Sequence, residues 1–231
     1  MALCFHRVRQ VRPDEALFPE MSCPEAEIDA LIDLLLEAGD RDRRWLTIAF
    51  DDGYRDAAEY LRARAQRYPE VEWLFFVCPR KVERRAGFVW DLAERSGKGA
   101  AADIGLCREL VGLPNVALGN HTNGHHRASS LTVETLRREY NDSARDFERL
   151  FGSQRHFAFP FGTPGRDVSE EAVELAREAA PLAVLWSTEA RGFDPVDRRP
   201  GAVLPRFAAD GTWGFRATAL RIARRARCDK R

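Results

Sequence analysis

Short apolar runs alternate with helical stretches along the whole chain, and this alternation limits the fold more than any other feature of the sequence. The run at 71–78 (VEWLFFVC) is apolar almost throughout, as is typical of a strand buried on both faces. The stretch at 132–151 repeats apolar residues at intervals of three and four and is followed by Gly152, which predicts an amphipathic helix. Such alternation favours βα units around a parallel sheet or barrel.

The same pattern extends to both ends of the chain. The segment at 79–102 mixes charged residues, glycine and aromatic residues, and we expect an irregular loop there. The length of 231 residues suits one barrel, and no repeat or linker divides it, so we predict a single catalytic domain over 1–231 with a basic C-terminal tail from about residue 213. Strands are predicted at 3–8, 45–50, 71–78, 116–118, 157–159, 182–186 and 203–207, and helices at 22–39, 55–68, 132–151 and 169–180.

The composition argues against several classes of partner. Lys plus Arg and Asp plus Glu each number 36, so no overall field would attract nucleic acid. No apolar run approaches the roughly 18 residues of a transmembrane helix. For the basic tail we expect a solvated helix, with weak contact with an anionic membrane surface as the alternative. No signal peptide is visible, which favours a cytoplasmic protein; an exported protein whose signal has been removed is the alternative.

Two short strings predict the two halves of one metal site. Asp51 and Asp52 end a predicted strand, and His121 and His125 follow another. Functional groups gather at the carboxyl ends of barrel strands, so all four side chains are expected on one rim. One carboxylate and two imidazoles are a common ligand set for a catalytic metal, and the second carboxylate is then free to act as a base. Either string alone fits an ordinary turn or exposed loop, but together they predict a metal-dependent hydrolase.

These strings resemble the motifs of polysaccharide deacetylases of the NodB-homology type, carbohydrate esterase family 4. The string at 50–53 (FDDG) matches the core of the first motif, 121–125 (HTNGH) matches the second, and 159–162 (FPFG) resembles the Pro-aromatic-Gly turn of the third. The similarity runs from about Leu3 to Arg206. The resemblance implies a distorted (β/α)7-type barrel that removes the N-acetyl group from an amino sugar of a polysaccharide or glycan precursor and releases acetate.

The resemblance also implies roles for individual residues. Asp51 is the general base, Asp52, His121 and His125 bind one divalent metal, and the backbone N–H of Phe161 helps to hold the oxyanion. Zn²⁺ is the expected metal, and Co²⁺, Ni²⁺ or Fe²⁺ also suits two imidazoles and one carboxylate. The implied partner is an N-acetylated sugar or oligosaccharide.

The chain departs from the family pattern at two places. Ala158 stands where an Arg usually orients the catalytic Asp, and no His follows His156 to serve as the usual acid. The string at 3–8 (LCFHRV) resembles the first strand of a subgroup in which an N-terminal Phe-His or Tyr-His replaces that acid. In a closed barrel the first and last strands are neighbours, so we predict that His6 protonates the leaving amine, with a partly buried structural His as the alternative. Arg206, at the end of a late strand, is predicted to brace Asp51, with a surface ion pair as the alternative.

Substrate contacts are less clearly marked in the sequence. Trp90, Asp91, Pro160 and Trp186 are the candidates, because aromatic faces suit the apolar faces of sugars. Core packing is the alternative for the two Trp residues. Two other functions remain open at this point: a deformylase or other C–N amide hydrolase on the same scaffold, and a catalytically silent glycan-binding protein.

Overall fold

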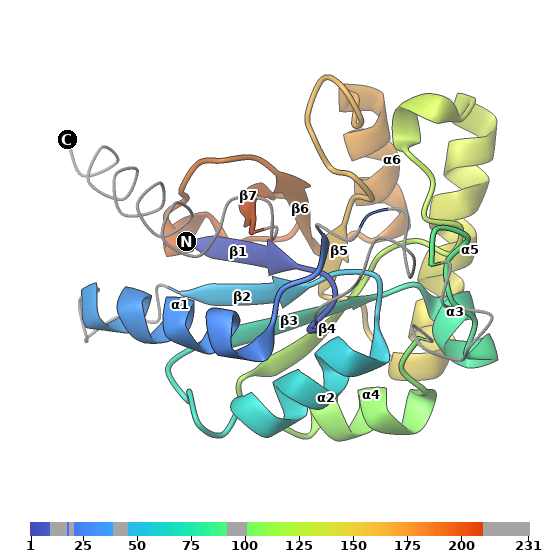
Figure 1. The fold of residues 1–231 in the computed structure, drawn as a ribbon. Coiled ribbons are helices and arrows are strands. Elements are labelled where there is room, and N and C mark those ends of the chain that lie inside the picture. Colours follow the sequence, from blue (N-terminus) through green and yellow to red (C-terminus); the bar gives the residue numbers. More distant parts are fainter. Residues whose placement is uncertain (10–17, 19–20, 39–45, 92–100, 210–231) are drawn as a thin grey trace.

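The structure is a computed structural model that describes residues 1–9, 18, 21–38, 46–91 and 101–209. Within these residues seven parallel strands close into one barrel in chain order (Figure 1). The first and last strands pair, with Leu3 opposite Phe207, so the barrel is complete. The strands are β1 (Ala2–Phe5), β2 (Thr47–Phe50), β3 (Glu72–Val77), β4 (Val116–Asn120), β5 (His156–Ala158), β6 (Val184–Thr188) and β7 (Val203–Ala208).

Helices pack around the outside of the strands (Figure 1). Three of them begin at a side chain that accepts a hydrogen bond from the first turn: Asp103 from Leu106 N, Thr132 from Thr135 N and Ser169 from Ala172 N. The helices are α1 (Glu25–Ala38), α2 (Arg55–Arg64), α3 (Pro79–Arg84), α4 (Ile104–Val111), α5 (Val133–Phe151) and α6 (Glu170–Ala179), with short 3₁₀ turns at Ala128–Ser130 and Pro195–Asp197.

The predicted (β/α)7-type barrel is confirmed, and two local expectations are wrong. The segment at 79–102 is not irregular throughout, because α3 occupies its first six residues. Helix α4 was not predicted at all. Both helices are short, at six and eight residues, so neither repeats its apolar positions often enough to show a period. Strand β1 also ends earlier than expected, at Phe5, so His6 lies just beyond the strand.

The barrel interior is filled by small and large side chains from alternate strand positions. Phe76 and Trp186 are its largest side chains, and the alanines of the same cluster leave room for them. A larger apolar layer lies between the strands and the helices and accounts for strands that are buried on both faces. The interior cluster consists of Ala2, Ala49, Leu74, Phe76, Ala158, Val184, Trp186 and Leu204.

No helix in the described part of the chain is long and apolar enough to cross a bilayer. The basic tail from about residue 213 lies outside the described residues. Its contact with a membrane surface therefore stays a prediction.

Gly53 tests how tightly the turn after β2 is held. It has a φ of 81°, and a Cβ at this position would lie 3.2 Å from the backbone of Val77. We expect Gly53→Ala to lower the free energy of unfolding by about 1–2 kcal/mol through left-handed strain, and further through crowding against β3. Gly165→Ala is the matched control, because Gly165 has a φ of 75° and open space around its Cβ position. Urea unfolding of both variants measures the difference, and equal losses would contradict the crowding argument.

Candidate active site

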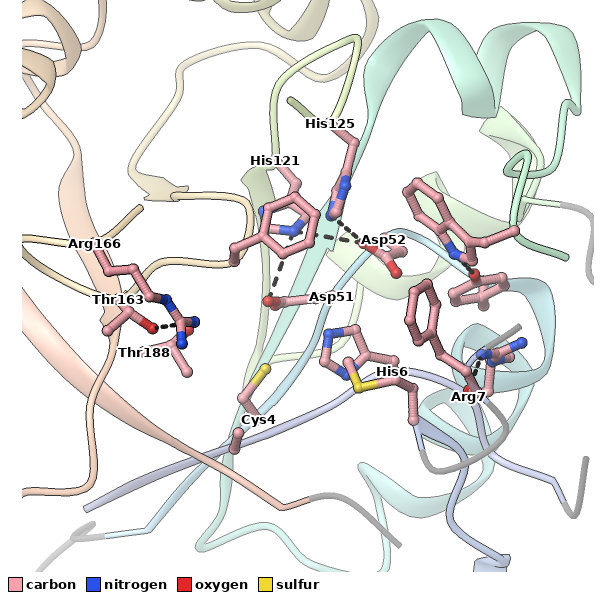
Figure 2. A pocket seen from close by; sticks show the side chains of 16 residues that line it. Cys4, His6, Arg7, Asp51, Asp52, His121, His125, Thr163, Arg166 and Thr188 are labelled. Carbon is pink, nitrogen blue, oxygen red and sulfur yellow. Dashed lines mark hydrogen bonds and ion pairs between the residues drawn. The ribbon is translucent and has the colours of Figure 1, made fainter. Parts of the chain in front are cut away.

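A cavity of about 320 Å³ lies at the carboxyl ends of the strands. Figure 2 shows that side chains following three different strands face it. His6 follows β1, Asp51 and Asp52 follow β2, and His121 and His125 follow β4. The predicted convergence of the two strings on one rim is therefore present in the structure.

Asp52, His121 and His125 bring one ligand atom each to a common point. Their ligand atoms all lie within 4.8 Å of one another, and all three residues are buried. Asp52 Oδ1 lies 2.9 Å from His125 Nε2 and 3.5 Å from His121 Nε2, yet it has no hydrogen-bond partner. A buried carboxylate oxygen without a hydrogen bond, facing two imidazole nitrogens, is what an N, N, O site for a divalent metal requires.

The protonation of His121 also suits a metal ligand. Its Nδ1 lies 2.8 Å from the Ala158 carbonyl oxygen, which can only accept, so Nδ1 carries the proton and the lone pair of Nε2 faces Asp52. Burial lowers the pKa of His121 to about 4, so the ring is neutral near pH 7. Burial alone would raise the pKa of Asp52, but the His125 imidazole beside it holds that pKa below its usual range. These three residues therefore fit a divalent metal such as Zn²⁺.

Strained backbone is concentrated around this cavity. Among the described residues five other than glycine have a left-handed φ, and four of them belong to the site: Asp52 (71°), Thr122 (63°), His125 (52°) and Phe161 (63°). Each costs on the order of 1–2 kcal/mol and persists only where the surroundings hold it. Such clustering is typical of a site whose side chains must point in directions that relaxed turns do not allow.

Hydrogen bonds within the turn and from neighbouring residues hold the His121–His125 turn. Thr122 N donates to Asn120 Oδ1 at 2.9 Å, and His125 N donates to Thr122 Oγ1 at 3.1 Å. Glu139, on α5, accepts from the backbone N–H of Asn123 at 2.8 Å and of Gly124 at 2.6 Å. Sequence analysis missed Glu139, because nothing in the helical pattern distinguishes this carboxylate from the solvated ones beside it.

Arg206 makes the predicted bidentate contact with Asp51. Nη1 lies 2.5 Å from Oδ1 and Nη2 lies 3.0 Å from Oδ2, and the Arg206 side chain is fully buried. The alternative of a surface ion pair is therefore wrong. Burial alone would raise the pKa of Asp51, but the Arg206 guanidinium, with His121 and His6, keeps that pKa below its ordinary value. Asp51 is thus an oriented carboxylate that stays ionised.

His6 lies in the cavity, as Figure 2 shows. A ring nitrogen of His6 lies within 4.8 Å of a carboxylate oxygen of Asp51. The side chain is half-buried, and burial lowers its pKa although Asp52 and Asp51 act in the opposite direction. A lowered pKa makes the protonated imidazole a stronger proton donor. The position agrees with the predicted acid, whose role stays a prediction.

Aromatic rings hold the orientation of His125. Its Nδ1 is buried without a hydrogen-bond partner, so no hydrogen bond at that atom fixes the ring. Ring centroids of Trp90, Phe161 and Phe88 lie 5.0, 5.3 and 5.5 Å from that of His125. Trp90 also lines the cavity, which agrees with its predicted position in a sugar groove.

A buried polar network contacts Trp90 through its indole N–H. Trp90 Nε1 donates to Tyr54 Oη at 3.2 Å, and Tyr54 Oη donates to Asp91 Oδ2 at 2.9 Å. Asp91 Oδ1 accepts from Arg7 Nη1 at 2.6 Å, and both side chains are almost wholly buried. Sequence analysis missed Arg7 and Tyr54, although each adjoins a motif residue.

Three of the predicted substrate contacts do not line the cavity. Asp91 is enclosed by Arg7 and Tyr54, so it supports the cavity wall and does not face a substrate. Pro160 is buried outside the cavity lining, where its carbonyl accepts from Gly162 N at 2.7 Å and shapes the turn. Trp186 is buried in the barrel interior and donates from Nε1 to His156 Nδ1, at the opposite end of the barrel.

The far wall of the cavity carries polar residues that the sequence did not mark. Thr163, Arg166 and Thr188 line it, and Arg166 donates to Thr163 Oγ1 at 3.0 Å and to the buried Asp167 at 2.9 Å (Figure 2). No spacing rule identifies such residues, since Thr163 and Arg166 share a turn after β5 whereas Thr188 ends β6, and only the barrel brings the two segments together.

Comparison with known proteins agrees with this geometry. The sequence profile of one family, described as polysaccharide deacetylase, matches residues 38–180, which include both halves of the predicted metal site. The chain belongs to the polysaccharide deacetylase family. No curated protein is similar enough in sequence to match it.

Several solved structures of deacetylases share the fold of this protein. The de-N-acetylase of Aggregatibacter actinomycetemcomitans is 13% identical, with a TM-score of 0.72 over 95% of this chain and 98% of that one. The deacetylase PplD of Streptococcus pyogenes is 11% identical, with a TM-score of 0.69 over 96% of each chain. IcaB of Ammonifex degensii is 18% identical, with a TM-score of 0.67 over 96% of each chain. At these identities the likeness shows the fold alone.

Replacing Trp90 tests whether rings orient His125. We expect Trp90→Ala to weaken binding of Zn²⁺ by about 10–100-fold, as loss of an outer partner of a metal ligand does, because the His125 ring is then free to turn. Competition with a chelator measures the dissociation constant. Val89→Ala is the control, since the neighbouring Val89 is 85% exposed and its replacement should leave the affinity for Zn²⁺ unchanged. Unchanged metal affinity in Trp90→Ala would contradict the orienting role.

Proposed function

We propose that this protein is a metal-dependent N-deacetylase that hydrolyses the acetamide of an N-acetylated amino sugar and releases acetate. One observation carries the proposal above all others. Asp51 is ionised, braced by Arg206 and adjacent to the Asp52–His121–His125 group, yet it does not belong to that group. A protein that only binds glycans has no need for an oriented carboxylate beside a metal site.

Asp52, His121 and His125 are the residues that would hold the metal. When bound, a divalent cation supplies polarisation of the amide carbonyl and a water of lowered pKa. Zn²⁺ is the expected ion because the set contains two neutral imidazoles and one carboxylate, and Co²⁺, Ni²⁺ or Fe²⁺ suits the same donors.

Asp51 acts as the general base for the attacking water. Its bidentate contact with Arg206 leaves further lone pairs of both oxygens available, since a carboxylate offers about four acceptor sites. The guanidinium keeps the carboxylate ionised and fixes its direction, at the cost of weakening its basicity. Proton transfer to a group placed in this way is worth about 10²–10⁴ in rate.

The turn at 159–162 supports the predicted oxyanion contact. Phe161 has a φ of 63° between Pro160 O and Gly162 N, which are 2.7 Å apart, so the turn is a strained γ-turn. Its residue Phe161 lines the cavity beside His125. A backbone N–H directed at the developing negative charge would stabilise the transition state by about 3 kcal/mol.

His6 serves as the acid that protonates the leaving amine. It lines the cavity, and a ring nitrogen of His6 lies within 4.8 Å of a carboxylate oxygen of Asp51, so the proposed acid and base face the same space. Trp90 and the half-exposed ring of Phe161 form an apolar wall for the sugar. A deformylase or another C–N amide hydrolase would use the same groups, so the acyl group and the sugar must be decided by assay.

Acetate release from N-acetylglucosamine oligomers by the zinc-loaded protein tests the function, and Asp51→Asn tests the base. We expect Asp51→Asn to lose about 10²–10⁴-fold in kcat while its zinc content equals that of the wild type, because Asn cannot take the proton. Formamide substrates cleaved in preference to acetamides would favour the deformylase. A zinc-loaded Asp51→Asn protein with wild-type turnover would contradict the assignment.

His6→Ala tests the predicted acid. We expect turnover to fall by roughly 10²-fold or more with unchanged zinc content, because no other imidazole among the described residues of the cavity is free of the metal group. His156→Ala is the control, since His156 contacts Trp186 at the other end of the barrel. Unchanged turnover in His6→Ala would return the acid role to water.

A further inference from the structure

A second group of metal-ligand atoms lies beside the first. Cys4 Sγ, a ring nitrogen of His6 and a carboxylate oxygen of Asp51 all lie within 4.8 Å of one another. All three residues line the cavity, and Figure 2 shows the Cys4 sulfur and the His6 ring near Asp51. None of them belongs to the Asp52–His121–His125 group.

Strand pairing explains why these side chains converge. Cys4 and His6 are two residues apart, so they point to the same side of the chain as it leaves β1. In the parallel register Cys4 lies opposite Ala49, which stands two residues before Asp51. Asp51 N donates to Phe5 O at 2.9 Å and ties the two chain segments together where both strands end. The group is therefore held by the barrel itself and not by mobile surface side chains.

We propose that Cys4, His6 and Asp51 form a second cation site, selective for thiophilic divalent metals such as Zn²⁺, Cd²⁺ and Co²⁺. Sulfur, imidazole nitrogen and carboxylate oxygen are the donors that such ions bind in proteins, whereas Mg²⁺ and Ca²⁺ require oxygen ligands. Three protein ligands facing a cavity leave a fourth position open to solvent. In the binding step a Cys4 S–M bond forms as the S–H bond breaks, and the proton passes to solvent.

The second site binds more weakly than the first. Arg206 already contacts both oxygens of Asp51, and its charge repels an incoming cation. Asp51 Oδ2 also lies 3.7 Å from His121 Nε2, so a cation held by the first group lies close by. Binding must in addition displace the thiol proton, which the first group does not require. Metal therefore fills the first group first and the second group when it is in excess.

Occupancy of the second site has a functional consequence that rests on the proposed function. A cation held there engages both Asp51 and His6, the proposed base and acid. The same ion would then support activity at one equivalent and inhibit at higher concentration. Inhibition would be stronger with Cd²⁺, whose affinity for sulfur is high, and absent with Mg²⁺.

Titration of the metal-free protein with Co²⁺ tests the site without reference to activity. The first group contains no sulfur, so a near-ultraviolet thiolate-to-cobalt charge-transfer band should appear only with the second equivalent. Cys4→Ala and Cys4→Ser should each bind the first equivalent normally and show no band. Cys23→Ala is the matched control, because the half-buried Cys23 lies 4.0 Å from Glu27 and should leave the band intact. A band that survives both Cys4 variants, or no band in the wild type, overturns the proposal.

Inhibition by excess metal tests the consequence separately. With acetate release as the readout, and with each protein compared with its own turnover in the absence of Cd²⁺, Cys4→Ala should raise the inhibition constant for Cd²⁺ by at least the roughly tenfold that loss of even an outer partner costs a metal site. A charge-transfer band without any deacetylase activity would leave the second site standing and remove the proposed function. Activity that Cd²⁺ inhibits equally in wild type and Cys4→Ala would overturn the inhibitory role of the second site.

Discussion

The buried ion pair between Arg206 and Asp51 determines how the rest of the site is arranged. Strand β1 pairs with β2 on one side and with β7 on the other, so this contact spans β1. Burial of both groups costs desolvation free energy that their attraction does little more than offset, so the pair is weak evidence for stability. Its effect is geometric: it fixes both oxygens of Asp51, and a ring nitrogen of His6 lies within 4.8 Å of one of them.

The groups around this pair are held in strained conformations by neighbours that take no part in the chemistry. Asp52, His125 and Phe161 have left-handed backbone, and all three line one cavity. Glu139, which accepts hydrogen bonds from the turn before His125, and the rings packed on His125 hold this arrangement. The strained conformations lower stability but fix the directions of the site residues. The supporting residues should therefore affect metal affinity nearly as much as the ligands do.

Spatial replacement accounts for the departures from the family pattern. Ala158 lacks the guanidinium that the resemblance places there, and Arg206 reaches the same carboxylate from β7 and stacks over Phe76, with its Cζ 4.8 Å from the ring centroid. Ala158 still contributes through its carbonyl, which accepts from His121. The barrel closes β1 against β7, which brings His6 to the cavity, where we propose that it takes the place of the missing C-terminal imidazole. A function can persist while the residues that serve it move along the chain, since only their positions in space matter.

By itself the sequence determined the barrel and the core of the site, because both depend on local spacing. Alternating apolar runs predict the strands, and Asp51, Asp52, His121 and His125 stand within short strings at strand ends. Only the tertiary structure decided which distant residues meet. Arg206 is 155 positions from Asp51, so the choice between bracing Asp51 and forming a surface ion pair depended on closure of the barrel. It also decided burial, which removed Asp91 and Trp186 from the substrate wall. A residue's type shows what chemistry it can perform, but whether it faces a cavity or a core depends on packing between distant segments.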